Sequence, residues 1–304
     1  MSEASRRVLF LFLDGVGLGS GDANVNPLVA AHLPVLTDLS GGRWTTELPA
    51  SRSGDALFRP LDATLGIEGL PQSATGQTTL LTGLNGAQVM QRHYGPWPGP
   101  TLQKLLQQGT LFHEGQLLAG AVLANAYPEG YFASIDTRAF KPNAPVVASR
   151  SASVELRGMD RYRAGQAVAA DLSGERFTDP STGTKAQVPK EAAQVLAEMA
   201  RQASLTFFDL WLTDAIGHEQ DAARSVELLE RVDELVGALL YEGAGEAFTL
   251  VITSDHGNIE DLTTKGHTMS TVPLLVVGAG ASEFAEAASL VHVAPAIRCL
   301  WKGA

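Results

Sequence analysis

Three aspartates and three histidines come directly after apolar runs of the sequence or in the short loops that follow them. They are Asp14, Asp214, His218, Asp255, His256 and His267. Carboxylate oxygens and imidazole nitrogens are the ligands that hard and borderline divalent ions prefer. Taken singly, such an aspartate is more often a helix cap and such a histidine a hydrogen-bonded surface residue. Helix caps have no reason to occur beside histidines, so the combination predicts a metal site.

Two hydroxyl side chains stand at the start of a predicted helix in the middle of the chain. Ser73 and Thr75 precede Gly76 in the stretch LPQSATGQTTLLTGLNG. The N–H groups of a helix N-terminus stabilise negative charge on a nucleophile and on an incoming phosphoryl group, and a metal can deprotonate a serine. An ordinary N-cap explains the hydroxyls equally well. Ser73 and Thr75 are therefore both candidate nucleophiles.

These residues need a sheet whose strand ends meet at one edge. Short apolar runs alternate with helical patterns, which predicts an α/β fold with a mainly parallel central sheet and helices on both faces. In such folds, ligands collect at the carboxyl ends of the strands. The predicted strands are 8–13, 118–125, 205–212, 248–254 and 272–278. The predicted helices include 27–39, 75–84, 100–108, 190–202 and 222–243.

The pattern changes between residues 131 and 184, where apolar runs are short and Arg, Ser, Pro and Gly are frequent. We interpret this segment as a small inserted lid on a core formed by residues 1–130 and 185–304. Arginine suits phosphate and carboxylate groups because its donors form a fork. The candidates for substrate contacts are Arg138, Arg150, Arg161 and Arg163 in this segment, together with Asn24 and Gln72 near the expected metal loops. A solvated charged surface and turn formation remain the alternative roles for these residues.

The charge and composition of the chain exclude several classes of function. The 304 residues carry a formal net charge of −11, which argues against a nucleic-acid surface, because phosphate contact needs a basic footprint. The single cysteine excludes an intrachain disulfide and fits a reducing compartment. The N-terminal apolar run ends at Asp14, too short for an export signal or a membrane span. We therefore expect a cytoplasmic protein without a membrane partner, and a homo-oligomer stays open.

Five sequence blocks in order carry a family resemblance. They are Asp14-Gly, Gln72-Ser73-x-x-Gly76, Asp214-x-x-Gly-His218, Ser254-Asp255-His256-Gly-Asn258 and Gly266-His267-Thr268. This order resembles the alkaline phosphatase superfamily, and most of all the branch containing cofactor-independent phosphoglycerate mutase and phosphopentomutase. The sequence departs from that branch at Gln77, where a histidine usually follows the motif glycine.

The resemblance implies an alkaline-phosphatase-like core with two divalent ions, Mn²⁺ or Zn²⁺. It assigns Asp214, His218 and His267 to one ion. It assigns Asp14, Asp255 and His256 to the second ion. It makes Ser73 the phosphorylated nucleophile that contacts a metal, with Thr75 as the weaker candidate. We expect a phosphomonoester hydrolase acting on a small phosphorylated metabolite, because the short insertion offers less cover than a mutase needs. The alternatives are a phosphomutase, a phosphodiesterase or phosphonate hydrolase, and a non-catalytic metal-binding protein.

Overall fold

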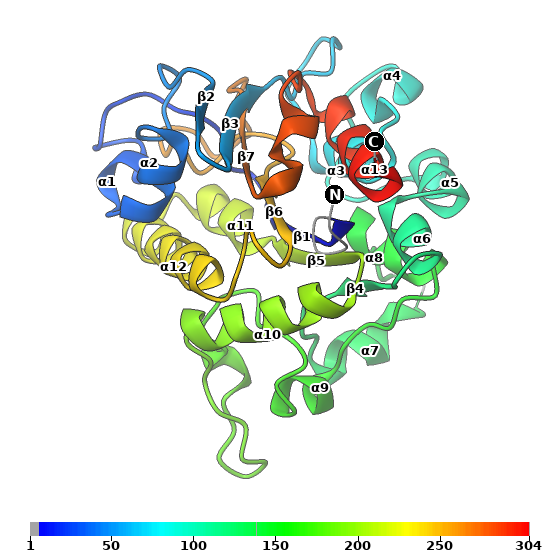
Figure 1. Ribbon diagram of the computed structural model, residues 1–304. Coiled ribbons are helices and arrows are strands. Elements are labelled where there is room, and N and C mark those ends of the chain that lie inside the picture. The colour runs from blue at the N-terminus through cyan, green and yellow to red at the C-terminus, as the bar shows by residue number, and fades with distance from the viewer. Residues whose placement is uncertain (1–5, 138, 304) are drawn as a thin grey trace.

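The structure is a computed structural model that describes residues 6–137 and 139–303. The centre of this part of the chain is a seven-stranded sheet with the order β2-β3-β7-β6-β1-β5-β4 (Figure 1). The neighbours β6, β1, β5 and β4 run parallel, whereas β7, β3 and β2 are joined by antiparallel pairing. The strands are β1 (Val8–Leu13), β2 (Ser51–Ser53), β3 (Ala56–Leu61), β4 (Ala121–Leu123), β5 (Leu205–Leu210), β6 (Thr249–Thr253) and β7 (Val272–Val277).

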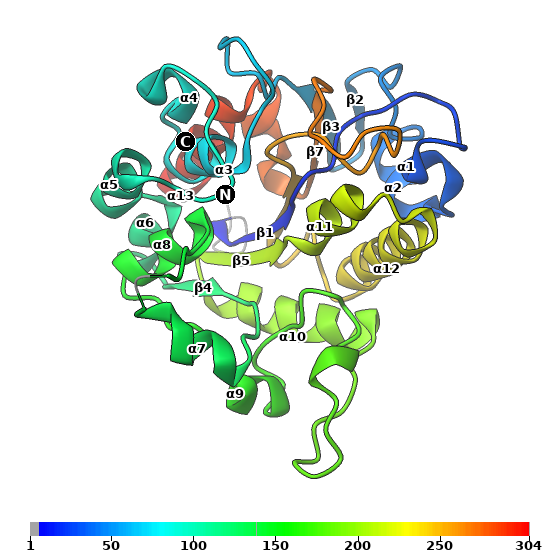
Figure 2. The ribbon, with the colours of Figure 1, turned by 180° about the vertical axis from the view of Figure 1, so that it is seen from behind.

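Helices cover both faces of this sheet (Figures 1 and 2). Side chains of β1 alternate between the two: Leu9 and Leu11 belong to the apolar core with α10 and α12, and Phe10 and Phe12 to the core with α3, α8 and α13. Burial on both faces explains why this strand is a continuous apolar run. The α/β fold class expected from the sequence is thereby confirmed. The longer α-helices are α3 (Ser73–Thr82), α5 (Pro100–Gln108), α8 (Ala144–Ser151), α10 (Pro189–Gln202), α11 (Leu212–Glu219), α12 (Ala222–Tyr241) and α13 (Val293–Lys302). The shorter ones are α1 (Pro27–Ala30), α2 (Pro34–Ser40), α4 (Gly86–Met90), α6 (Leu111–Gln116), α7 (Glu129–Ile135) and α9 (Met159–Arg163), with 3-10 turns η2 (Glu175–Phe177), η3 (Ala279–Phe284) and η4 (Leu290–His292).

Two sequence-based expectations about elements were wrong. The helix predicted over residues 27–39 is two helices, α1 and α2, because the backbone of Ala31 is extended and Pro34 starts a new helix. A residue that precedes proline avoids the helical region, and Leu33 accordingly has non-helical dihedral angles. Strands β2 and β3 were not predicted, since SRS is short and ALFRPL contains Arg59 and Pro60.

The strand register brings the chemistry together at one edge of the sheet. Leu13 of β1 pairs with Leu210 of β5, and Phe12 pairs with Thr253 of β6. The next residues along all three strands therefore leave the sheet at the same level. Asp14 follows β1 directly, and its N–H donates to the carbonyl of Leu210 at 3.3 Å. Asp255 follows β6 by two residues in the same place.

The segment 131–184 consists of short helices and loops beside β4 (Figure 2). Its helix α8 packs against α3, α5 and α6, and Ala144, Val146 and Ala148 are buried in the core. This part of the segment is therefore fixed to the core, and movement as a lid stays a prediction for the rest. Among the described residues, no helix combines the length and apolar character needed to cross a membrane.

Candidate metal centre and nucleophile

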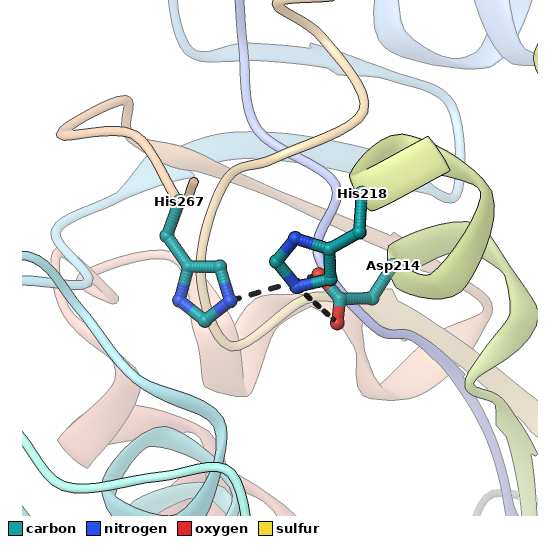
Figure 3. Close-up of side chains that lie close together, drawn as sticks. All are labelled: Asp214, His218 and His267. Atoms are coloured by element: carbon teal, nitrogen blue, oxygen red, sulfur yellow. Dashed lines mark ion pairs between the residues drawn. The ribbon is translucent and has the colours of Figure 1, made fainter. Parts of the chain in front are cut away.

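Helix α11 carries two of the predicted ligands one turn apart, and a loop brings a third against them. Asp214 and His218 are four residues apart on α11, with the His218 Nε2 atom 3.2 Å from Asp214 Oδ2. His267 comes from the loop before β7, and its Nε2 atom is 3.8 Å from Asp214 Oδ1. Figure 3 shows the two imidazoles converging on the carboxylate. One ligand atom of each residue lies within 4.8 Å of the others, a spacing that fits a single ion.

A second group of ligand atoms within the same span contains Asp14, Asp214 and His256. The family resemblance assigned Asp255 to this group, and the structure places Asp255 directly beside it. Asp255 Oδ2 is 3.5 Å from His256 Nε2, and Asp14 Oδ1 is 3.4 Å from the same nitrogen. The two groups share Asp214, and the His256 and His267 rings stack at 3.7 Å between centroids. The six predicted ligands thus form one contiguous cluster.

Hydrogen bonds orient the imidazole rings for metal binding. The Nδ1 atoms of His267 and His218 face the backbone carbonyls of Pro71 and Lys265, the first at 2.7 Å. A carbonyl oxygen can only accept, so each Nδ1 carries the proton and, in the neutral ring, each Nε2 keeps a lone pair directed into the cluster. Partners of this kind fix the tautomer of histidines that bind metals. The donor set therefore fits divalent ions.

Burial makes the acidic part of the cluster unfavourable without a cation. Desolvation raises the pKa of Asp14 well above its ordinary value, and the neighbouring charges of Asp255 and Asp214 raise it further. The same two causes, burial and the Asp214 charge, raise the pKa of Asp255 to about 7. The Oδ1 atom of Asp14 is buried and has no hydrogen-bond donor among the described residues. A positive ion at this position would relieve the repulsion and satisfy that oxygen.

The pKa values of the three histidines shift in different directions. Burial lowers the pKa of both His256 and His267, so both rings are neutral near pH 7. His218 is partly exposed, and its hydrogen bond with Asp214 raises its pKa to about 9. Burial acts to raise the pKa of Asp214, but the hydrogen bonds from His218 and Asn258 outweigh it and bring the pKa to about 2.

Ser73 is the first residue of α3 and points into the cluster. Its Oγ atom lies 2.9 Å from His256 Nε2, and the side chain is buried. Thr75 is also buried, but its hydroxyl donates to the carbonyl of Gln72 at 2.9 Å, an intrahelical contact at the start of α3. The structure therefore places Ser73 beside the predicted ligands and gives Thr75 a local structural partner.

Sequence reasoning did not assign roles to three polar residues that hold the ligands. Asn258 donates from Nδ2 to Asp214 Oδ1 at 2.6 Å. Gln77 donates from Nε2 to Asp14 Oδ2 and Asp255 Oδ2, both at 3.1 Å. The Glu260 carboxylate accepts from the N–H groups of Gly17 and Asn258 and so connects the loop after β1 with the loop after β6. Asn258 and Gln77 stand within the sequence blocks, which was the available signal, whereas nothing local marked Glu260.

The predicted substrate residues are not brought together. Within the described residues, three of the arginines bind partners inside the segment 131–184. Arg150 donates to Asp136, and Arg161 donates to Glu155 and Gln166. Arg163 donates to the hydroxyl of Thr184. Asn24 donates to Asp22 in an exposed turn. Gln72 precedes Ser73 at the N-cap of α3, with no side-chain hydrogen bond to the helix. Arg138 lies outside the described residues. Substrate contacts by these residues stay predictions.

The fold and the cluster define the class: an α/β enzyme scaffold with metal-ligating side chains at the carboxyl edge of its sheet. The chain belongs to the Metalloenzyme superfamily, whose family model matches residues 6–299. It is similar to the 2,3-bisphosphoglycerate-independent phosphoglycerate mutase of Pyrococcus abyssi, with 26% identity over 140 residues. That match covers 46% of this chain and 34% of the relative, so the chain spans about a third of that relative's length.

Solved structures show the same fold along nearly the whole chain. The alkaline phosphatase of the Antarctic bacterium TAB5 superposes with a TM-score of 0.54 and 14% identity, covering 98% of each chain. Phosphoglycerate mutase of Leishmania mexicana gives a TM-score of 0.50 and 12% identity, covering 97% of this chain and 95% of the other. The resemblance seen in the sequence, to the alkaline phosphatase superfamily with its mutase branch, is thereby confirmed.

Proposed function

We propose that the protein is a metal-dependent phosphoryl-transfer enzyme in which Ser73 is the nucleophile. One divalent ion would be held by Asp214, His218 and His267, and a second by Asp14, Asp255 and His256, with Mn²⁺ and Zn²⁺ both suited to these ligands. The observation that carries the proposal is the position of Ser73 Oγ, 2.9 Å from His256 Nε2 within the ligand cluster and at the N-terminus of α3.

The proposed reaction has two displacements. When bound, the ions would supply positive charge that lowers the pKa of the Ser73 hydroxyl and neutralises the phosphoryl oxygens. Ser73 Oγ loses its proton to solvent and forms a bond to phosphorus while the ester P–O bond breaks, and the leaving oxygen takes a proton from solvent. The N–H groups at the start of α3 stabilise the phosphoryl group on Ser73. Water then attacks phosphorus, releases inorganic phosphate and restores the serine.

We favour water as the final acceptor, which makes the enzyme a phosphomonoester hydrolase. The side chain of His218 is 43% exposed, so solvent reaches this part of the cluster. A mutase would return the phosphoryl group to a second hydroxyl and would need to exclude water. Similarity to phosphoglycerate mutases supports the mutase as the second candidate. Release of inorganic phosphate, as opposed to an isomerised phosphoester, separates the two.

The test is the intact mass of the metal-loaded protein after brief incubation with a panel of phosphomonoesters. We expect a species heavier by one phosphoryl group in the wild type and none in Ser73→Ala. Thr75→Ala is the matched hydroxyl variant and should keep the phosphorylated species. Turnover that survives in Ser73→Ala would overturn the proposed nucleophile.

A further inference from the structure

A cavity of about 470 Å³ with aromatic walls is lined by residues that follow β4, by the segment 131–184 and by the start of α11. Its volume falls in the range of small-molecule binding sites. Six aromatic side chains line it: Trp97, Tyr127, Tyr131, Phe140, Phe177 and Trp211. Two of these, Trp97 and Trp211, are 46% and 40% exposed, so they present apolar ring surface to solvent.

Two lining segments are close in sequence to the elements that carry Ser73 and Asp214. Trp97 stands two residues after Gly95, where a Cβ atom would lie 3.3 Å from the backbone nitrogen of Ser73. Trp211 is the N-cap and Leu212 the first residue of α11, the helix that carries Asp214. Figure 2 shows α11 at the end of β5, with α7 beside β4. The cavity therefore lies within reach of a phosphoester whose phosphorus is at Ser73.

The aromatic rings are held in fixed positions. Tyr127 and Tyr131 stack with 4.3 Å between centroids, and Phe140 meets Tyr131 edge-on at 4.9 Å. Two amides of the lining, Asn125 and Asn143, are fixed by hydrogen bonds with Asp209 at 2.9 and 2.7 Å. Preformed aromatic walls with few polar groups suit a flat apolar group, because ring faces and edges pair at these distances.

We propose that this cavity binds the alcohol portion of the substrate and that this portion carries a planar aromatic ring. The proposal rests on the proposed function, since it concerns the leaving group of that reaction. It gives the segment 131–184 a role, because Tyr131, Phe140 and Phe177 all come from it. Lys141 and Arg176 stand in the same lining, together with the acidic side chain of Asp171.

The kinetic test compares 2-phenylethyl, 2-cyclohexylethyl and ethyl phosphate on the metal-loaded enzyme. All three release an alkyl alcohol, so their intrinsic reactivity is matched and differences report binding. We expect kcat/KM for the phenyl ester to exceed that of the ethyl ester by roughly tenfold or more. The phenyl ester should also exceed the cyclohexyl ester. Equal values for the phenyl and ethyl esters, or for the phenyl and cyclohexyl esters, would overturn the proposal.

Variants connect the preference to the cavity. Tyr131→Leu and Trp97→Ala should each reduce the ratio of phenyl to ethyl kcat/KM by about fivefold or more. Tyr241→Leu is the matched control, because Tyr241 is 85% exposed at the end of α12 and does not line the cavity. A ratio that stays at the wild-type value in both cavity variants would contradict the assignment.

Fluorescence separates failure of this proposal from failure of the proposed function. Of the four tryptophans, Trp97 and Trp211 line the cavity, whereas Trp44 and Trp301 are buried elsewhere. 2-(4-Nitrophenyl)ethanol should quench the holoenzyme saturably, and less so in Tyr131→Leu. Saturable quenching without turnover of any ester would uphold the cavity and refute the phosphoryl transfer. Turnover of the esters without saturable quenching would uphold the phosphoryl transfer and refute the assignment of the cavity.

Discussion

At the scale of single residues, the buried amide of Gln77 bridges an acidic pair. Its Nε2 atom contacts both Asp14 and Asp255, two carboxylates whose burial raises their pKa values. An amide can donate to both and adds no charge, so it positions the pair and leaves Asp14 Oδ1 without a hydrogen-bond donor among the described residues. Positioning partners of this kind contribute to metal affinity without touching the ion.

Removing this amide should weaken metal binding. We predict that Gln77→Ala lowers the affinity for Mn²⁺ or Zn²⁺ by about 10- to 100-fold, because Asp14 and Asp255 lose the donor that orients them. Competition with a chromophoric chelator measures the affinity. Gln88→Ala, at an exposed glutamine of α4, should bind metal as the wild type does. An unchanged affinity in Gln77→Ala would show that the amide has no positioning role.

Asp209 gives a prediction about pH. Burial raises its pKa to about 7, against 3.8 ordinarily, although the hydrogen bond from Asn143 opposes the shift. The folded state thus favours the neutral form, so the stability that Asp209 contributes is present below about pH 4 and is lost as the pH rises towards 7. An asparagine side chain at this position would stay neutral at every pH and could still accept from Asn143.

We therefore expect Asp209→Asn to stabilise the metal-free protein more at pH 8 than at pH 5, by on the order of 2 kcal/mol. Urea unfolding at the two pH values measures the difference. Asp136→Asn is the control, at an exposed aspartate, and should show little change. A gain of the same size at both pH values would mean that Asp209 is ionised in the folded state throughout this range.

At the scale of elements, the approach of α3 to the loop after β6 depends on Gly76. A Cβ atom at this position would lie 2.8 Å from both the Cβ and the backbone oxygen of Asp255. The absence of a side chain lets the helix that presents Ser73 pack directly on the loop that presents Asp255 and His256. Both elements must shift if this contact is filled.

Gly76→Ala should therefore move Ser73 away from Asp255 and His256. We expect a loss of about 1–3 kcal/mol in the free energy of unfolding, even though alanine favours helix, and weaker metal binding as well. Denaturant unfolding and metal titration measure the two effects. Gly130→Ala is the matched control, because Gly130 is also helical and a Cβ there meets no atom within 4 Å. Equal stability changes in the two variants would contradict this account.

At the scale of the whole molecule, the candidate metal site joins segments from both ends of the chain. Its candidate ligands follow β1, β5 and β6, and the loop before β7 supplies His267. A ligand that binds only the folded state stabilises it according to its concentration and affinity. The buried acids add to this effect, since without ions they repel one another within a protein of net charge −11.

Removal of divalent ions should consequently lower the melting temperature. At a free metal concentration of about 100 times Kd, the expected loss is about 2.7 kcal/mol, or roughly 5–10 °C for a protein of this size. Differential scanning calorimetry with Mn²⁺ or Zn²⁺ and with EDTA measures the shift. Asp214→Asn should remove most of it, and the exposed Asp38→Asn none. The same melting temperature in metal and in EDTA would argue against a resident ion.

The amino-acid sequence by itself determined the core strands, the fold class and the chemical types at the site. Runs such as VLFLFL are buried on both faces, and that environment leaves a pattern in the residues themselves. The candidate ligands could also be selected from the sequence, because acids and histidines seldom occur together after several apolar runs, and metal binding by them stays a prediction. By contrast, β2 and β3 were missed, since SRS is short and the end of ALFRPL, beyond its pairing with β2, contains Arg59 and Pro60.

Only the tertiary structure decided which distant residues meet. The position of Asp214 in both ligand groups, the contact of Gln77 with Asp14 and Asp255, and the aromatic cavity all join segments far apart in sequence. The arginines that looked suited to a substrate instead pair locally, within their own segment. Local sequence patterns record the burial of each element. Contacts between elements depend on strand register and helix packing, and these are set by the fold as a whole.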